Sequence, residues 1–226
     1  MEHGTRHLYN IEKNRTFHFA IFVAQRLNIG VDSPLPPDPP IRKTCRRYNV
    51  AGHAHYLTFS CFKRRAFLNR DRTREWMIDA IALARERHLL DLWAWVIMPE
   101  HVHLLIHPRD ADYDISAILS TLKQPVSKRA LLFVQREAPQ FARWMLDRQP
   151  NGKEAKRFWQ RGGGYDHNLW TPAKVWEKID YIHANPVRRG LVESAGDWHW
   201  SSHADHVNLR RGRLPLDRES LPFLAR

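Results

Sequence analysis

The sequence has only two cysteines, Cys45 and Cys61, among its 226 residues. Two thiols are too few for a disulfide framework or a four-thiolate zinc site, so a reducing compartment, the cytoplasm, is expected. No apolar run of about 18 residues occurs, and we expect neither a transmembrane helix nor a membrane partner. The apolar stretch FHFAIFVA after Arg15 contains His18 and is followed by no clear small-residue cleavage site, which disfavours a secretion signal.

Acidic residues are also scarce relative to basic ones. Asp and Glu total 24 against 36 Lys and Arg, which gives a formal net charge of +12. Such a surplus indicates a polyanionic partner, most often a nucleic acid, although charge alone leaves open a basic protein without one. Hydrophobic residues make up 43% of the chain and aromatic residues 11%, a composition typical of a globular protein.

A proline-rich segment, DSPLPPDPP, sets the first part of the chain apart. Such a segment forms neither a helix nor a central strand. We therefore interpret residues 1–42 as an N-terminal extension with a linker, 43–206 as one catalytic domain, and 207–226 as a C-terminal tail. The sequence contains no internal repeats.

Hydrophobic periodicity predicts alternating strands and helices across the domain. Apolar strands are expected at 53–67, 89–98, 101–107 and 157–170, the last with a flexible glycine triplet. Amphipathic helices are expected at 70–88, at 114–138 with a bend or interruption at Pro125, and at 171–186, where Pro186 ends the helix. This order predicts an α+β fold, an antiparallel sheet with helices packed mainly on one face.

The strand EHVHLLIH carries titratable groups within an apolar run. Because residues two apart share a strand face, His101 and His103 lie together, while Val102 and Leu104 face the core. Two imidazoles about 6–7 Å apart along a strand can bind one divalent metal. A solvent-facing histidine pair is the alternative. His107 is interpreted as an ordinary surface or hydrogen-bonded histidine, and Glu100 as a solvated charge in the turn.

The helix at 171–186 places a tyrosine away from its apolar stripe. Thr171 is a plausible N-cap before Pro172, and Val175, Ile179 and Ile182 form the stripe. Tyr181 lies about 120° from the centre of that stripe, with Asn185 one turn further along. Its phenol is a candidate nucleophile, and a tyrosine at the rim of the core is the alternative.

Three motifs in this order carry a family resemblance: WVIMPEHVHLLIH, then FWQRG and YDHNLW, then IDYIHANPVRRGLV and DWHWSS. They resemble the REP-associated tyrosine transposases, which are HUH single-tyrosine transposases of insertion sequences, over residues 48–206. The stretch RGGGYDH departs from the RGYYDH usual in that family. The resemblance implies a ferredoxin-like HUH fold and an enzyme that cleaves and rejoins single-stranded or hairpin DNA.

The resemblance also implies roles for individual residues. His101 and His103 correspond to the metal-binding histidines, Asn185 to the third, polar ligand, and Tyr181 to the nucleophile that forms a 5′-phosphotyrosine and leaves a 3′-OH. Tyr165 is the second candidate nucleophile. Mg²⁺ or Mn²⁺ is the expected ion, and two imidazole ligands make Mn²⁺ a good competitor.

Basic residues near these motifs are candidate contacts to the DNA backbone. They are Arg46, Arg47, Lys63, Arg64, Arg65, Lys178, Arg188 and Arg189. Trp198 and Trp200 are interpreted as core residues rather than base-stacking platforms. Two other functions remain open: a hairpin-binding protein that does not cut, and a metal-dependent nuclease without a covalent intermediate. The target sequence and the choice between monomer and homodimer are also open.

Overall fold

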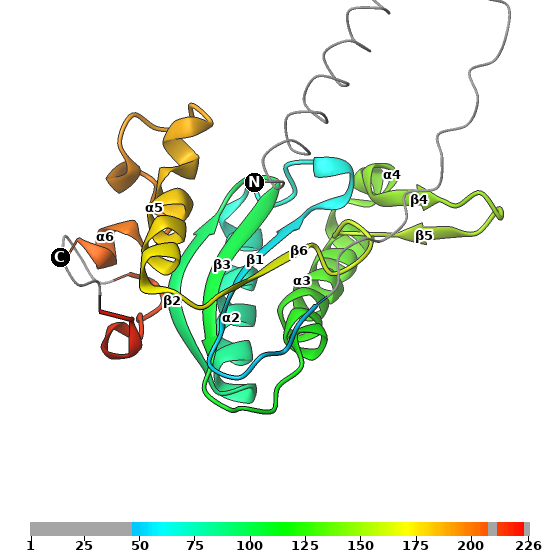
Figure 1. Cartoon of the computed structure of the whole chain (residues 1–226). Helices are drawn as coiled ribbons and strands as arrows, with labels where there is room; N and C mark the ends of the chain where they lie inside the picture. Colours follow the sequence, from blue (N-terminus) through cyan, green and yellow to red (C-terminus); the bar gives the residue numbers. More distant parts are fainter. Residues whose placement is uncertain (1–46, 208–211, 224–226) are drawn as a thin grey trace, which may run out of the picture. The chain divides into compact units, whose positions relative to one another are not determined.

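A computed structural model describes residues 47–207 and 212–223, which form a four-stranded antiparallel sheet with helices on both of its faces (Figure 1). The strand order is β2-β3-β1-β6. The strands are β1 (Ala54–Ser60), β2 (Leu90–Ile97), β3 (His101–Pro108) and β6 (Tyr165–Leu169). The long helices are α2 (Asp71–Arg87), α3 (Ile115–Glu137) and α5 (Pro172–Arg188). The predicted extension at 1–42 and Arg46 lie outside the described residues.

Shorter elements fill the connections. They are the hairpin of β4 (Leu146–Arg148) and β5 (Glu154–Lys156), the helical turns α4 (Ala142–Met145) and α6 (His203–His206), and four 3₁₀ turns, η1 (Phe62–Arg64), η2 (Pro139–Phe141), η3 (Ala195–Asp197) and η4 (Arg218–Ser220). Within the described part of the chain, no helix is long and apolar enough to cross a membrane.

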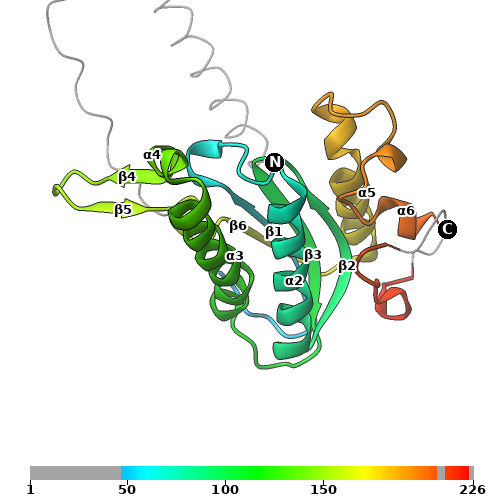
Figure 2. The same cartoon turned by 180° about the vertical axis from the view of Figure 1, so that it is seen from behind.

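The order of elements around the sheet is β1-α2-β2-β3-α3-β6, with β1 between β3 and β6. This is the split βαβ arrangement of ferredoxin-like folds, and the predicted α+β class is confirmed. Helices α2 and α3 lie together on one face of the sheet, whereas α5, which follows β6, lies on the other (Figure 2).

Alternation along β1 and β3 divides the core between the two faces. Leu57 and Leu104 are fully buried in the cluster that also holds the apolar side chains of α2 and α3. Leu105, one residue later in β3, belongs to a second cluster with Val175 and Ile179 of α5. The histidine face of β3 is therefore covered by α5, and the predicted core face and helix stripe are confirmed.

Two helix boundaries differ from the prediction. Helix α3 continues through Pro125 without a break, because Leu122 and Val126 on either side are buried in the core. Helix α5 continues past Pro186 to Arg188. A proline in the last turn disturbs little, and the chain instead turns at Gly190, whose φ of +64° suits the residue after a helix end.

The sequence pattern also overestimated two strands and missed a hairpin. The strand predicted at 53–67 ends at Ser60, and the 3₁₀ turn η1 follows it at Phe62–Arg64. Only Tyr165–Leu169 of the predicted 157–170 strand pairs with β1, and the β4–β5 hairpin was not expected. Trp200 is buried and Trp198 packs against the core, as predicted. In the segment assigned to a tail, Leu214 is buried and the Asp217 carboxylate lies 2.7 Å from Arg85.

Candidate functional site

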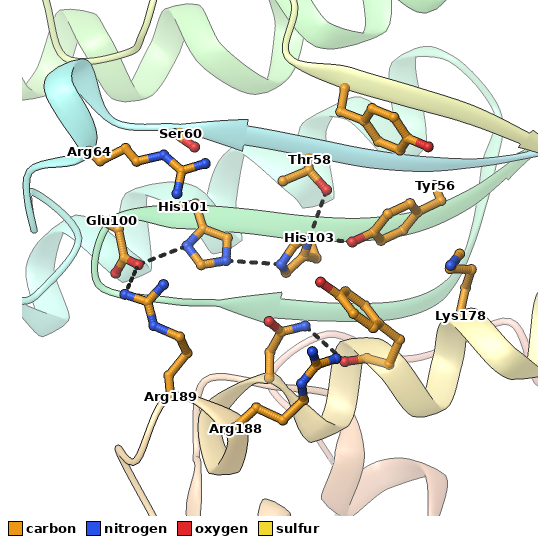
Figure 3. Close-up of a pocket in the computed structure, with 13 residues that line it drawn as sticks. Tyr56, Thr58, Ser60, Arg64, Glu100, His101, His103, Lys178, Arg188 and Arg189 are labelled. Carbon is orange, nitrogen blue, oxygen red and sulfur yellow. Dashed lines mark hydrogen bonds and ion pairs between the residues drawn. The ribbon is translucent and has the colours of Figure 1, made fainter. Parts of the chain in front are cut away.

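A cavity of about 550 Å³ opens between the histidine face of the sheet and α5 (Figure 3). Strand β1, strand β3 and helix α5 supply most of its walls, and β6 contributes one tyrosine. The residues lining it are Tyr56, Thr58, Ser60, Arg64, Glu100, His101, His103, Tyr165, Lys178, Tyr181, Asn185, Arg188 and Arg189. The structure thus brings the predicted histidines, Asn185 and Tyr181 into one cavity.

Strand pairing places the two histidines beside polar residues of β1. His103 lies opposite Thr58 and His101 lies opposite Ser60. Although the two histidines are two residues apart in the strand, their rings turn toward each other, and the Nε2 atoms are 2.9 Å apart. Both imidazoles therefore present a nitrogen to the same point of the cavity.

The other ring nitrogen of His103 is held by two hydroxyl groups of β1. Nδ1 lies 2.8 Å from the Tyr56 Oη atom and 2.7 Å from the Thr58 Oγ1 atom. The Tyr56 ring also stacks on the imidazole, with ring centroids 5.5 Å apart. Burial, together with the neighbouring His101, lowers the pKa of His103 to about 3. His103 is therefore neutral near pH 7, the form in which histidine binds metals.

His101 is oriented by a carboxylate. Its Nδ1 atom lies 3.2 Å from Glu100 Oε1, and the same oxygen lies 2.8 Å from the Arg189 guanidinium. Glu100, expected to be a solvated turn residue, has only 13% of its side chain exposed. Burial lowers the pKa of His101, and the Glu100 carboxylate opposes this effect. A carboxylate behind a histidine fixes its tautomer and ring orientation.

These contacts determine which nitrogens face the cavity. When Nδ1–H of His101 donates to Glu100 and Nδ1–H of His103 donates to a hydroxyl, both Nε2 atoms present lone pairs to each other. Two facing lone pairs repel each other, so this pair of tautomers is stable only with a cation or a proton between the nitrogens. Nitrogens about 2.1 Å from one ion lie about 3.0 Å apart at a right angle, which agrees with the separation of these Nε2 atoms. The histidine pair therefore fits a divalent metal.

Asn185 of α5 is the candidate third donor beside the histidine pair. It is buried, and its Nδ2 group donates to the Tyr181 carbonyl at 2.8 Å. Its side chain also reaches His103, where it raises the histidine pKa against the effect of burial. Among the described residues, no group of three or more His, Cys, Asp or Glu side chains is placed to hold a metal. The candidate donors are accordingly two imidazoles and one amide.

Tyr181 lies directly beside the histidine pair. Its ring centroid is 5.9 Å from that of His103 and 6.1 Å from that of Tyr56. The Lys178 Nζ atom is 5.4 Å from the Tyr181 ring centre, and the Arg188 guanidinium is 5.0 Å from it. A tyrosine, a histidine pair and two cations thus converge where a phosphate group can bind.

Tyr165, the second candidate nucleophile, lines the same cavity from the β6 side. Its ring centroid is 6.0 Å from that of Tyr56, and its hydroxyl lies 3.2 Å from the Nδ1 atom of His167. Tyr165 has 52% of its surface exposed, and its ring centroid lies 6.0 Å from that of His167. Both tyrosines line the cavity, and the Tyr181 ring lies beside His103.

The predicted backbone contacts divide into two groups. Four of them line the cavity: Arg64, Lys178, Arg188 and Arg189. The other described ones lie outside its lining. Arg47 donates to the Ser116 hydroxyl, Lys63 lies over the Phe62 ring, and Arg65 lies over the Trp144 ring.

Four cavity residues were missed by sequence reasoning: Tyr56, Thr58, Ser60 and Glu100. Alternation along a strand puts Tyr56, Thr58 and Ser60 on one face of β1. Only the pairing register of β1 with β3, which single-sequence patterns do not contain, puts that face beside the histidines.

The fold is one found in transposases. Residues 49–182 match the family described as "Transposase IS200 like", and the chain belongs to this family. Within it, the chain is similar to the REP-associated tyrosine transposase of Escherichia coli K12, with 26% identity over 76% of this chain and 88% of the relative. It is 28% identical to a putative REP-associated tyrosine transposase of Haemophilus influenzae Rd, over 68% of this chain and 85% of the relative.

A solved structure supports the fold independently. It is a REP-associated tyrosine transposase bound to a REP hairpin, with a TM-score of 0.55 and 24% identity over 76% of this chain and 88% of that chain. The predicted resemblance to this group of transposases is confirmed.

Proposed function

We propose that the protein cleaves and rejoins single-stranded DNA at hairpin-forming repeats, with Tyr181 as the nucleophile and a 5′-phosphotyrosine as the intermediate. The observation that carries the proposal is the convergence of Tyr181 with the facing Nε2 atoms of His101 and His103 in one cavity. Hairpin DNA as the partner is supported by the similar transposase that was solved with a REP hairpin.

The proposed reaction exchanges one phosphoester for another. The Tyr181 hydroxyl gives up its proton as its oxygen attacks the scissile phosphorus and a tyrosyl O–P bond forms. The bond from phosphorus to the 3′ oxygen breaks, and that oxygen takes up a proton and leaves as a 3′-OH. Because the phosphoester is conserved in the covalent link, a 3′-OH can attack the phosphotyrosine and release the tyrosine. One residue can therefore both cut and join strands.

Several side chains of the chain support this chemistry. His101, His103 and Asn185 would hold Mg²⁺ or Mn²⁺, and the bound ion would supply Lewis-acid polarisation of the phosphate. Lys178 and Arg188, which flank the Tyr181 ring, stabilise negative charge on the phosphate and on the attacking oxygen. Glu100 holds Arg189 and His101 in fixed positions relative to each other.

The test is a covalent adduct between the protein and DNA. Wild-type protein is incubated with a labelled single-stranded hairpin substrate and Mg²⁺ or Mn²⁺, and the products are separated under denaturing conditions. We expect an adduct that maps to the peptide containing Tyr181. Tyr181→Phe, which removes one hydroxyl and keeps the ring, loses both cutting and the adduct.

Tyr165→Phe is the matched control, because it removes the other candidate hydroxyl of the same cavity. It retains the adduct if Tyr181 is the nucleophile. Cutting without an adduct would indicate a nuclease that uses water, and binding without cutting would indicate a hairpin-binding protein. A nucleotide attached to the peptide that contains Tyr165 would show that Tyr165 is the nucleophile.

A further inference from the structure

A second cavity, of about 340 Å³, lies between α3 and the segment 156–162 that leads from the β4–β5 hairpin toward β6. Its lining includes five cations and neither Asp nor Glu. The cations are Lys123, Lys128, Lys156, Arg157 and Arg161. We call this cavity the basic cavity.

Much of this positive charge is not neutralised within the described ranges. Arg157 and Arg161 share a single carboxylate, Asp147, at 2.5 and 3.0 Å. Lys123, Lys128 and Lys156 form no ion pair with any residue in those ranges, and the Lys123 ammonium donates to the Gly162 carbonyl at 2.6 Å. A concave surface lined by like charges concentrates anions from solution.

The glycine triplet, which departs from the family pattern, brings two cations close together. A Cβ atom at Gly163 would lie 1.3 Å from the guanidinium of Arg47, so the missing side chain makes room for that arginine. The neighbouring carbonyl of Gly162 holds Lys123. Burial and the nearby Arg47 charge lower the pKa of Lys123 to about 8. A bound anion would offset this repulsion.

The basic cavity adjoins the candidate site. Gln160, which lines the basic cavity, donates its backbone N–H to the carbonyl of Ser60, which lines the first cavity, at 2.9 Å. The Gln160 side chain also accepts the backbone N–H of Lys63, one residue before Arg64. This hydrogen bond joins the two linings at the edge of the sheet, because α3 and α5 lie on opposite faces of it.

We propose that the basic cavity binds backbone phosphates of the DNA strand beside the cleavage position, with Lys123, Lys128 and Lys156 as the phosphate contacts. The identity of the polyanion rests on the proposed function, whereas the basic cavity itself rests on its own geometry. DNA held in both cavities is fixed at two points, and this aligns the scissile phosphate with Tyr181.

The experiment compares matched charge reversals. Lys128→Glu and Lys156→Glu change two exposed side chains of the basic cavity, and Arg87→Glu makes the same change at the exposed C-terminal end of α2, outside both linings. Affinity for a hairpin oligonucleotide with a single-stranded extension is measured by fluorescence anisotropy over a series of salt concentrations. Thermal melting checks that each variant folds.

We expect weaker binding by both lysine variants. The slope of log affinity against log salt should fall in magnitude by about 0.7–0.9 for each phosphate that a variant no longer neutralises. Arg87→Glu retains the wild-type slope. Lysine variants with the affinity and slope of Arg87→Glu would overturn the proposal. Failure of the proposed function is a separate result, because it would show as the absence of any tyrosine adduct with the wild-type protein.

Discussion

The phenolic oxygen of Tyr56 lies 2.8 Å from the Nδ1 atom of His103, on the side of the imidazole that faces away from His101. Thr58, paired with His103 across β1 and β3, places its hydroxyl 2.7 Å from the same nitrogen. Burial raises the pKa of Tyr56, so its phenol stays neutral. The two hydroxyls fix the orientation of an imidazole that we propose binds metal, and such outer groups tune ligand strength.

Loss of both hydroxyls should therefore weaken metal binding. We expect the double variant Tyr56→Phe and Thr58→Val to bind Mn²⁺ about 10–100-fold more weakly than wild type. Tyr56→Phe alone loses less, because Thr58 remains. Isothermal titration with Mn²⁺ measures this without DNA. Tyr48→Phe, at an exposed tyrosine, is the control, and equal Mn²⁺ affinity of the double variant and this control would refute the orienting role.

Removal of the candidate ligands should have graded effects. His101→Ala and His103→Ala are expected to abolish cleavage and the adduct, whereas Asn185→Ala weakens the reaction and raises the metal concentration that it needs. His103→Ala also leaves two hydroxyls without their partner, which costs about 1–3 kcal/mol of stability. His101→Ala is the cleaner test, because this side chain is less buried.

Adduct yield over a Mn²⁺ titration distinguishes the three variants. Undiminished cleavage by His101→Ala would refute the hypothesis that the histidine pair binds a metal ion required for cleavage. An Asn185→Ala variant with the metal requirement of wild type would remove Asn185 from the ligand set and leave the histidine pair in place.

Local sequence patterns were sufficient to predict which side chains of β3 and of α5 face the site. The alternation of β3 placed His101 with His103, and the periodicity of α5 placed Tyr181 off the apolar stripe. Both patterns reflect burial, and the hydrophobic periodicity of a single sequence indicates which side chains are buried. The orientation of Glu100 was missed because it depends on Arg189, which is distant in the sequence and lies just after α5. The position of Glu100 in a turn does not indicate that Arg189 is its partner.

The proline interpretations failed for a related reason. Pro125 and Pro186 were expected to bend or end helices, since each removes a backbone hydrogen bond. Packing of α3 against α2 compensates in the first case, and the helix ends within three residues in the second. Tertiary contacts and position within the helix decided both outcomes, and neither is a local property of proline.

Gly164 should be the least replaceable residue of the glycine triplet. Its φ is +84°, and a Cβ atom there would lie 2.2 Å from the Thr58 carbonyl oxygen, which belongs to the backbone and cannot rotate away. Gly52 has a similar φ of +77° with nothing within 4 Å of a Cβ. Gly52→Ala therefore carries only the conformational cost of about 1–2 kcal/mol, and Gly164→Ala carries that cost plus a steric clash.

Urea denaturation of the two alanine variants makes the comparison. We expect Gly164→Ala to lose at least about 1 kcal/mol more free energy of unfolding than Gly52→Ala. Because Thr58 also contacts His103, Gly164→Ala should weaken Mn²⁺ binding as well, whereas Gly52→Ala leaves it unchanged. Equal stability of the two variants would mean that β6 shifts freely at this point.

Binding of DNA should depend on pH through Lys123. Its pKa is lowered from 10.5 to about 8, first by burial and then by Arg47, so the lysine is charged at pH 7 and loses its charge as the pH rises through about 8. A positive charge attracts phosphate and a neutral amine does not, so this contribution to affinity is present below that pKa and fades above it. Phosphate bound to Lys123 stabilises the protonated form and moves the transition upward.

The measurement is the ratio of DNA affinities of wild type and Lys123→Gln from pH 7 to pH 9. Lys123→Gln has no charge to lose, so we expect the ratio to favour wild type at pH 7 and to fall toward one as the pH rises. Titration of DNA bases and of other side chains affects both proteins alike and cancels in the ratio. A ratio that stays constant over this range would show that Lys123 does not contact the phosphates, because deprotonation of a contacting lysine must weaken binding.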